Sequence, residues 1–394
     1  GAEYRREKVN YEQDPLVRNG YTFYSAIGDF VAPAFEVKEA FAEVRLPLLK
    51  DSPFAEELTI SGAARVSDYK GSAGTTWAYN VGIDYAPIPD IRFRAAYARA
   101  VRAPNLSDLY FPASQNFAPG FIDPCSLNNI KNGSATREAN CRAAGVPTNF
   151  NYIYAQSLET LSGGNIAAGG SGLKSEKSDS YTVGTVIQPT FVPGLSLSVD
   201  YYNIKVSNVI TSPGAQSIVD TCYDSPTTDN QFCALFQRDF NDPTDPGRIV
   251  EGSLVDSPLN YAALKVRGID TQIAYRHRFN EDLTIGAKFV YTHVLENTSF
   301  LDLTQPGFGD SALDELGDPR DAFNFDLDIT AGKVFINYGL RFLSHQLFGE
   351  YEAVNSFQGR DPENVDTAEP AYYPSVVYMD LRFGFNIDAK SNFY

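Results

Sequence analysis

The residues in this chain that could most readily do chemistry are its four cysteines, which fall in two close pairs. Cys125 lies near Cys141 in the sequence, and Cys222 lies near Cys233. An even number of cysteines in local pairs favours one disulfide within each pair in an oxidising compartment, where each bridge would stabilise its loop by about 2–3 kcal/mol. Four reduced thiols are the alternative. A zinc site is not expected, because no CxxC spacing or neighbouring histidine accompanies the cysteines.

The three histidines, His277, His293 and His345, do not form a catalytic pattern. A predicted turn at 280–281 pairs the segments 260–279 and 282–296, which sets His277 and His293 at opposite ends of the strand pair. No nucleophile elbow, phosphate-binding loop or paired-histidine motif is present. We therefore predict that the chain is not an enzyme and uses no cofactor.

One predicted loop is acidic and could hold Ca²⁺, which prefers clustered oxygen ligands. Its carboxylates do not follow the spacing of an EF-hand, so we expect a solvated acidic loop and no metal site. The residues concerned are Asp302, Asp310, Asp314, Glu315, Asp318 and Asp321.

Aromatic residues and amides gather in the segment 103–175, and such side chains suit oligosaccharides, peptides and aromatic siderophores equally. Packing of the loop on itself is the alternative for each of these residues. The candidate ligand-contacting residues, most of them in or next to the predicted loops, are Arg102, Tyr110, Phe111, Phe117, Tyr152, Tyr154, Tyr202 and Tyr223.

The composition favours a single β-rich unit. The 394 residues include 24 Tyr and 27 Phe, which strands prefer, and 30 Gly and 23 Pro, which turns prefer. The net charge of -17 argues against a nucleic-acid partner, because an acidic surface repels phosphate. No run of about 18 apolar residues could form a transmembrane helix, whereas a spanning barrel strand needs only about 9–11 residues, alternately apolar and polar.

Alternation of apolar and polar residues is the main structural signal, and it predicts β-strands. In one example, Met379, Leu381, Phe383 and Phe385 alternate with polar or small residues. About twelve such segments are present. They lie near 1–10, 37–49, 57–69, 75–87, 90–102, 176–190, 194–210, 260–279, 282–296, 320–331, 333–347 and 373–388.

The connections between these segments alternate between short and long. The long ones are 11–36, 103–175, 211–259, 297–319 and 348–372, with only 70–74 brief among them. Short turns on one side and long loops on the other are typical of an outer-membrane barrel. We therefore predict an all-β, antiparallel, up-and-down transmembrane β-barrel; a soluble all-β protein with one wet face is the alternative.

The barrel interpretation also predicts which way side chains point. Charged residues in mid-strand should face a polar lumen, because an Arg facing lipid at the membrane midplane costs about 2–4 kcal/mol. We expect the lipid-facing residues to include Ile91, Phe93, Ala95, Tyr97, Phe323, Phe325, Leu327, Ile329, Met379, Leu381, Phe383 and Phe385. The lumen-facing residues should include Arg92, Arg94, Asn324, Asp326, Asp328, Asp380 and Arg382.

Two stretches carry a family resemblance. The run from Tyr97 to Tyr110, YARAVRAPNLSDLY, resembles the strand end that precedes a large extracellular loop in TonB-dependent outer-membrane receptors. The run from Leu173 to Gly184, LKSEKSDSYTVG, resembles the segment that re-enters the barrel after that loop. Ser175 replaces the proline that is usual in the family, and Thr182 replaces the usual acid.

The resemblance implies a barrel of about 22 strands with a plugged lumen, of which this chain supplies about twelve, incomplete at both ends. Residues 1–394 would then be part of the barrel domain, with the N-terminal signal, the plug domain and the first strands absent. It implies an outer-membrane receptor of a Gram-negative bacterium that imports a ligand too large for porins, such as an iron–siderophore complex or an oligosaccharide. The expected partners are the lipid and lipopolysaccharide of the outer membrane, the plug and remaining strands, and the inner-membrane TonB complex. A passive porin-like barrel, an outer-membrane hydrolase and a soluble β-rich binding protein are the alternatives.

Overall fold

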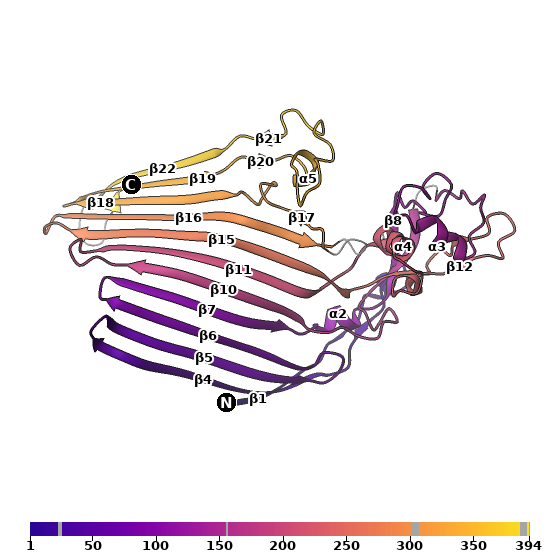
Figure 1. Ribbon diagram of the computed structural model, residues 1–394, viewed down its shortest axis with the longest axis horizontal. Helices are drawn as coiled ribbons and strands as arrows, with labels where there is room; N and C mark the ends of the chain where they lie inside the picture. The colour runs from indigo at the N-terminus through magenta and orange to yellow at the C-terminus, as the bar shows by residue number, and fades with distance from the viewer. Residues whose placement is uncertain (23–25, 155–156, 302–306, 387–391, 394) are drawn as a thin grey trace.

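Twelve antiparallel strands form one large sheet in the computed structural model, which describes residues 1–22, 26–154, 157–301, 307–386 and 392–393. Figure 1 shows these strands side by side, with β1 and β4 at one edge and β22 near the other. The strands are β1 (Ala2–Glu7), β4 (Phe35–Ser52), β5 (Ala55–Tyr69), β6 (Gly74–Ile88), β7 (Ile91–Arg102), β10 (Glu176–Ile187), β11 (Leu195–Thr211), β15 (Leu259–Arg278), β16 (Leu283–Phe300), β18 (Asp321–Ala331), β19 (Val334–Leu343) and β22 (Val376–Asn386).

Shorter elements lie mostly in the long connections. Two of them, β17 (Asp310–Ser311) and β23 (Asn392–Phe393), add two-residue pairings to the large sheet and bring its total to 14 strands. The others are β2 (Asn10–Tyr11), β3 (Phe30–Val31), β8 (Ser114–Pro119), β9 (Ser157–Ser162), β12 (Arg238–Asp239), β13 (Arg248–Ile249), β14 (Leu254–Asp256), β20 (Gln346–Leu347), β21 (Tyr372–Tyr373), α1 (Pro15–Arg18), α2 (Leu106–Tyr110), α3 (Arg137–Ala143), α4 (Ala215–Asp224), α5 (Tyr351–Val354) and the 3₁₀ turn η1 (Cys233–Leu235).

All twelve predicted strands are present, and each pairs with its predicted sequence neighbour. The strand boundaries differ from the prediction where hydrogen-bonded pairing does not coincide with the alternating sequence. The ladder continues to Thr211 opposite Leu259 and to Phe300, so the predicted loops 211–259 and 297–319 are shorter than expected. The segment 1–10 is a strand only over Ala2–Glu7, and Asn10 and Tyr11 pair separately with β3.

The connections alternate as predicted, with short turns at one end of the sheet and long loops at the other (Figure 1). The tight turn between β18 and β19 contains Gly332, whose φ of 57° lies in the left-handed region that glycine adopts without strain. Hairpins this tight hold neighbouring strands in antiparallel register.

The sheet has one apolar face and one polar face. Residues directly opposite each other in an antiparallel pair point to the same side, so the register carries one face from strand to strand. One row on the apolar face runs from Ile91 through its partners Ile187 and Leu197 to Ile273, Phe289 and Phe325. The register confirms the predicted partition: all the residues named above as lipid-facing share this face, and those named as lumen-facing lie on the opposite one.

Charged side chains in mid-strand pair on the polar face. Nε of Arg94 donates to Oδ1 of Asp200 at 2.8 Å, and Arg92 donates to Glu57 at 2.8 Å. β7 is therefore linked by ion pairs to β5 and to β11, each of them two strands away in the sheet. Such pairs suit a face that is in contact with water or polar groups.

Within the described residues the two ends of the sheet do not pair with each other. β1 pairs with β4 alone, and β22 pairs with β19 and β23. The described strands are thus an open wall and not a closed ring. No helix of the described chain is long and apolar enough to cross a bilayer.

The assignment of the two faces predicts opposite results for neighbouring residues of β10. Val183 lies exposed on the apolar face, and Thr182 lies exposed on the polar face. We expect Val183→Arg to destabilise the complete, membrane-inserted protein by about 2–4 kcal/mol, whereas Thr182→Arg changes its stability by less than about 0.5 kcal/mol. Denaturant titration of both variants folded into lipid vesicles measures the difference, and equal effects would contradict the assignment.

Candidate functional site

The two longest loops fold together into one lobe beyond the strand ends (Figure 1). This loop lobe comprises residues 103–175 and 212–258. In it, β8 and β9 pair antiparallel, and β14 from the second loop adds to β9 in parallel. α3 and α4 pack beside them around a common apolar core. The sequence predicted loops here, but not a lobe with its own core.

Both predicted disulfides are present, one in each of the two loops. Cys125 is bonded to Cys141, and Cys222 is bonded to Cys233. The sulfur-bearing residues Cys125, Cys141 and Cys222 are buried in the core of the lobe. Because a lobe of this size buries little apolar area, covalent cross-links add stability that packing alone would not supply.

A buried ion pair joins the two loops. Nη1 and Nη2 of Arg238 donate to Asp123 at 2.8 and 2.9 Å, and their side chains are 3% and 0% exposed. Arg238 also donates to the hydroxyl of Tyr223 at 2.7 Å and to the carbonyl of Gly247 at 2.6 Å. Its guanidinium lies over the rings of Tyr223, Phe150 and Phe236. The guanidinium is thus shielded from water, and each of its three nitrogens donates at least one hydrogen bond.

A second buried ion pair, between α3 and α4, also joins the two loops. Arg137 of α3 is 8% exposed in its side chain and donates to Asp224 and Asp220 of α4. Burial raises the pKa of Asp220, while the arginine opposes that shift. Neither ion pair could be predicted from the sequence, because Asp123 and Arg238 are 115 residues apart, Arg137 and Asp224 are 87 apart, and none of the four lies in a recognisable motif.

Two of the predicted ligand-contacting residues lie in the core of the lobe. Tyr154 is 7% exposed, and its hydroxyl accepts a hydrogen bond from the backbone N–H of Ile249 at 2.8 Å. Tyr223 is 2% exposed and accepts from Arg238. Burial raises the pKa of both phenols above their ordinary value. Their aromatic faces pack inward and leave almost no surface for a ligand.

The other predicted aromatic residues are more accessible. Phe117 of β8 is 48% exposed, and Phe111 at the end of α2 is 40% exposed. Tyr110 is half-buried, and Tyr152 is half-buried with its ring edge against Tyr154. Ligand contact by these residues stays a prediction, with Phe111 and Phe117 presenting the most surface.

Arg102 ends β7 on the polar face and is held by two carboxylates. It donates to both oxygens of Glu176 at 2.6 and 2.8 Å and to Asp108 at 3.0 Å. Asp108 also caps α2 together with Asn105. One hydrogen-bond network therefore connects the long-loop end of β7 to the first helix of the lobe. Arg102 would have to exchange a carboxylate for an anionic ligand in order to bind one.

Tyr202 lies on the polar face of β11, further from the long loops than Arg102. Gly268 on the neighbouring strand makes room for it, because a Cβ at that glycine would be 2.5 Å from the tyrosine hydroxyl oxygen. The structure therefore places Tyr202 in the wall and Arg102 at its rim, whereas Phe111 and Phe117 belong to the loop lobe.

The predicted acidic loop packs against the connection 344–375. Asp314 pairs with Arg320 at 2.7 Å, and Glu315 accepts from the backbone of Tyr351 at 2.9 Å. Asp318 accepts from Asn297 at 3.1 Å, and Asp302 lies outside the described residues. Among the residues that are described, no group of three or more Asp, Glu, His or Cys side chains could hold a metal ion. The acids are held by protein donors.

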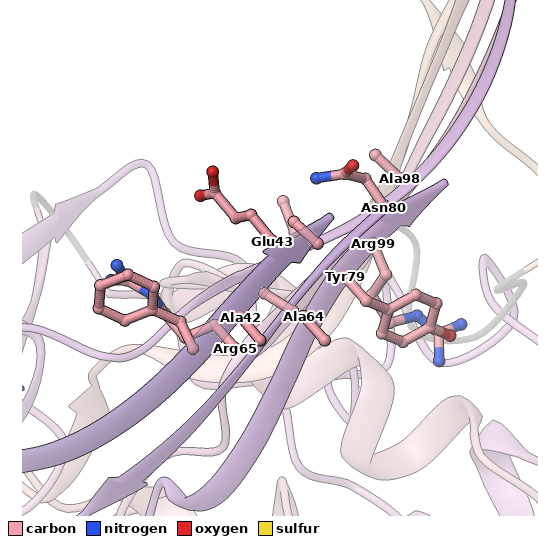
Figure 2. A pocket seen from close by; sticks show the side chains of 12 residues that line it. Ala42, Glu43, Ala64, Arg65, Tyr79, Asn80, Ala98 and Arg99 are labelled. Carbon is pink, nitrogen blue, oxygen red and sulfur yellow. The ribbon is translucent and has the colours of Figure 1, made fainter. Parts of the chain in front are cut away.

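A hollow of about 290 Å³ opens between β4 and β7, lined largely by alanines. Figure 2 shows Glu43 and Asn80 on one side of these strands and Tyr79 with Arg99 on the other, in agreement with the register. The small side chains at Ala63, Ala78 and Ala98 leave this part of the polar face recessed. Of the side chains around it, Glu43 and Asn80 face the lumen side and could meet a polar chain segment or ligand there.

The buried ion pair predicts a local loss of stability. Asp123→Asn leaves the Arg238 guanidinium buried without a counter-charge, which we expect to destabilise the loop lobe by about 3–5 kcal/mol. The matched control is Glu138→Gln, which removes an exposed pair with Lys131 and should cost less than about 1 kcal/mol. In the Asp123→Asn variant of the complete protein, hydrogen exchange should be faster in 103–175 and 212–258 and unchanged in the wall. Equal protection in the two variants would contradict the role of the pair.

Comparison with known proteins identifies the wall. A model of the TonB-dependent receptor-like β-barrel family matches residues 1–393. No curated protein matches the chain.

Among solved structures, the siderophore receptor PirA from Acinetobacter baumannii superposes with a TM-score of 0.55 at 12% identity, over 98% of this chain and 45% of that receptor. A mutant of the ferric enterobactin receptor PfeA from Pseudomonas aeruginosa, in complex with enterobactin, gives a TM-score of 0.56 at 15% identity, over 98% of this chain and 44% of that receptor. The chain thus spans less than half the length of these receptors, and the likeness shows a shared fold. Given the family match over its whole wall, the chain belongs to the TonB-dependent receptor-like β-barrel family.

Proposed function

We propose that this chain forms part of the wall of an outer-membrane receptor that imports, with energy from the inner membrane, a ligand too large for porins. The observation that carries the proposal is the partition of its strands into an apolar and a charged face, in a chain of this family. An apolar face suits lipid, and a charged face suits a wide lumen that is filled by water or by another polar domain.

The wall requires further strands to stand in a membrane. Unpaired backbone groups at an open edge cost several kcal/mol each in hydrocarbon. We infer that the remaining strands of a barrel of about 22, together with a plug domain inside it, belong to the same protein. The paired Arg92 and Arg94 on the polar face would then line the space around the plug.

The proposed partners follow from this placement. The apolar face contacts the lipid and lipopolysaccharide of the outer membrane, and the plug communicates with the inner-membrane TonB complex. A net charge of -17 leaves no reason for a nucleic-acid partner.

The loops supply the proposed ligand contacts. Phe111 and Phe117 expose aromatic surface beyond the long-loop end of the wall. Arg102 at the rim would bind an anionic ligand in exchange for one of its carboxylate partners, Glu176 or Asp108. These chemistries suit an anionic, aromatic chelate such as an iron–siderophore complex, and they also suit an oligosaccharide. PirA and PfeA, which share the fold, are a siderophore receptor and a ferric enterobactin receptor.

Energised uptake predicts dependence on the inner membrane. Cells that carry the complete protein should accumulate radiolabelled iron from ferric enterobactin, used as the probe, only when the TonB protein is present. If iron is not the cargo, the same cells supplied with a mixture of oligosaccharides should show TonB-dependent depletion of one of them. Uptake of small solutes that is indifferent to TonB, with a permanently open pore in planar bilayers, would instead establish a passive porin and overturn the proposal.

The exposed loop aromatics predict a change in affinity. We expect Phe111→Ala and Phe117→Ala each to weaken binding of the imported ligand by about tenfold, the equivalent of roughly 1.4 kcal/mol. Phe191→Ala is the matched control, because Phe191 is 84% exposed in a short turn at the opposite end of the wall. Binding titrations on whole cells give the three affinities. A loss in the Phe191 variant equal to that in the loop variants would argue against a site in the lobe.

A further inference from the structure

Five basic side chains of β7, β10, β11 and β15 occupy the apolar face, in the half of the wall that is nearer the long loops. The register sets Arg99 opposite Asp179, Asp179 opposite Lys205, and Lys205 opposite Lys265, in one row across four strands. Lys177 and Arg267 lie in the adjoining rows on the same face. We call Arg99, Lys177, Lys205, Lys265 and Arg267 the outward basic cluster.

These residues break the rule that the rest of the face follows. Below them the same strands present Val183, Ile187, Leu197, Val199 and Ile273. A cation among such residues is unfavourable at the membrane midplane and nearly neutral at its surface. Their position along the strands therefore decides what they can do.

The cluster lies at the height of a membrane surface. Lys205 is about ten residues along β11 from Leu195, and a tilted strand at about 3.3 Å per residue rises roughly 23 Å over that length. The apolar band of an outer-membrane barrel is about 25 Å tall. Tyr79 lies in this row, opposite Arg99, and Tyr97 and Tyr181 lie in the next row below it. Their ring centroids are 6.0 Å (Tyr79 to Tyr97) and 4.9 Å (Tyr97 to Tyr181) apart, and aromatic residues gather in this way at a lipid interface. Figure 2 shows Tyr79 and Arg99 together on this side of the strands.

The carboxylates of the protein do not neutralise the cluster. Asp179 pairs with Arg99 at 2.8 Å, and Glu296 pairs with Lys265 at 2.9 Å and Arg267 at 2.6 Å. No salt bridge joins Lys177 or Lys205 to a carboxylate in the part of the chain that the structure describes. Lys205 lies directly opposite Lys265 on the neighbouring strand, where like charges repel. Glu296 offsets the charge of Lys265, whereas Lys205 makes no salt bridge of its own among the described residues. In a chain of net charge -17, five bases against these two acids leave a local excess of positive charge, which favours an anionic partner.

We propose that the outward basic cluster binds the phosphate groups of an anionic lipid in the leaflet on the long-loop side of the membrane. The inference rests on the membrane placement in the proposed function. The cluster faces away from the polar face, so a ligand in the lumen does not reach it. Phosphate bridges the ammonium groups of Lys177, Lys205 and Lys265, and acyl chains lie along the apolar residues below.

The test measures lipid binding and not transport. The complete protein, purified in a neutral detergent, is titrated with bis-phosphorylated lipid A, and bound lipid is counted by native mass spectrometry. We expect Lys177→Gln combined with Lys205→Gln to weaken binding on the order of tenfold to thirtyfold. Lys50→Gln is the matched control, because Lys50 is an exposed lysine at the short-turn end of β4, and it should bind like the unaltered protein.

Further arms identify the source of the phosphate. Lipid A without phosphates should bind the unaltered protein as weakly as phosphorylated lipid A binds the double variant. Inorganic phosphate alone should not compete at millimolar concentration, and lysine-dependent competition by it would show a free-anion site and overturn the lipid proposal. Equal binding by the double variant and the unaltered protein would also overturn it. TonB-dependent uptake is measured separately. If the double variant binds lipid A as the unaltered protein does, and the protein still imports its ligand, the lipid proposal fails and the proposed function stands.

Discussion

The antiparallel hydrogen-bond ladder is the constraint on which the rest of this structure depends. Once a strand is paired in register, the direction of each side chain is fixed, and a shift of one residue would exchange the two faces. From β7 to β22 the ladder carries the row that contains Ile91 and Phe325 across the sheet, with one bulge in β15 and β16 near Gly268 and further shifts at the loop end of β11 and β15. Apolar contact on one face and charge pairing on the other both follow from this register.

This constraint explains why the wall could be predicted from the sequence. Alternation is a local property, and short turns such as the one at Gly332 leave a strand only its neighbour as a partner. The errors lie at strand ends, where pairing outlasts alternation, as at Thr211 and Phe300. There the hydrogen-bond partner decides the boundary, and the sequence of a single strand contains no information about it.

The loop lobe could not be predicted in the same way, because its core is built from contacts between two loops. Tyr154 and Tyr223 look like ligand-binding aromatics in the sequence, yet they meet partners from the other loop or from a distant part of the same one. Asp123 and Arg238 give no sign of each other at a separation of 115 residues. The disulfides were predictable, since each closes locally, but the ion pairs that hold the two loops together were not. Together these ties make the lobe a firm platform, on which Phe111 and Phe117 stay exposed.

The exceptions to the two-faced pattern are as informative as the pattern itself. On the apolar face, the described charged residues of the central strands, such as Lys205 and Glu296, lie in the half of each strand that is nearer the long loops. If these positions were simply solvated ends of strands, acids and bases would be expected in similar numbers in so acidic a chain. Instead the bases outnumber the acids there, whereas the loops above are rich in carboxylates such as Asp310, Asp314 and Glu315. The sign of the charge thus changes with height above the apolar band. The outward basic cluster, which lies below acidic loops, attracts an anion from the side, at the level where lipid phosphates lie. The acidic loops repel an anion that approaches from above.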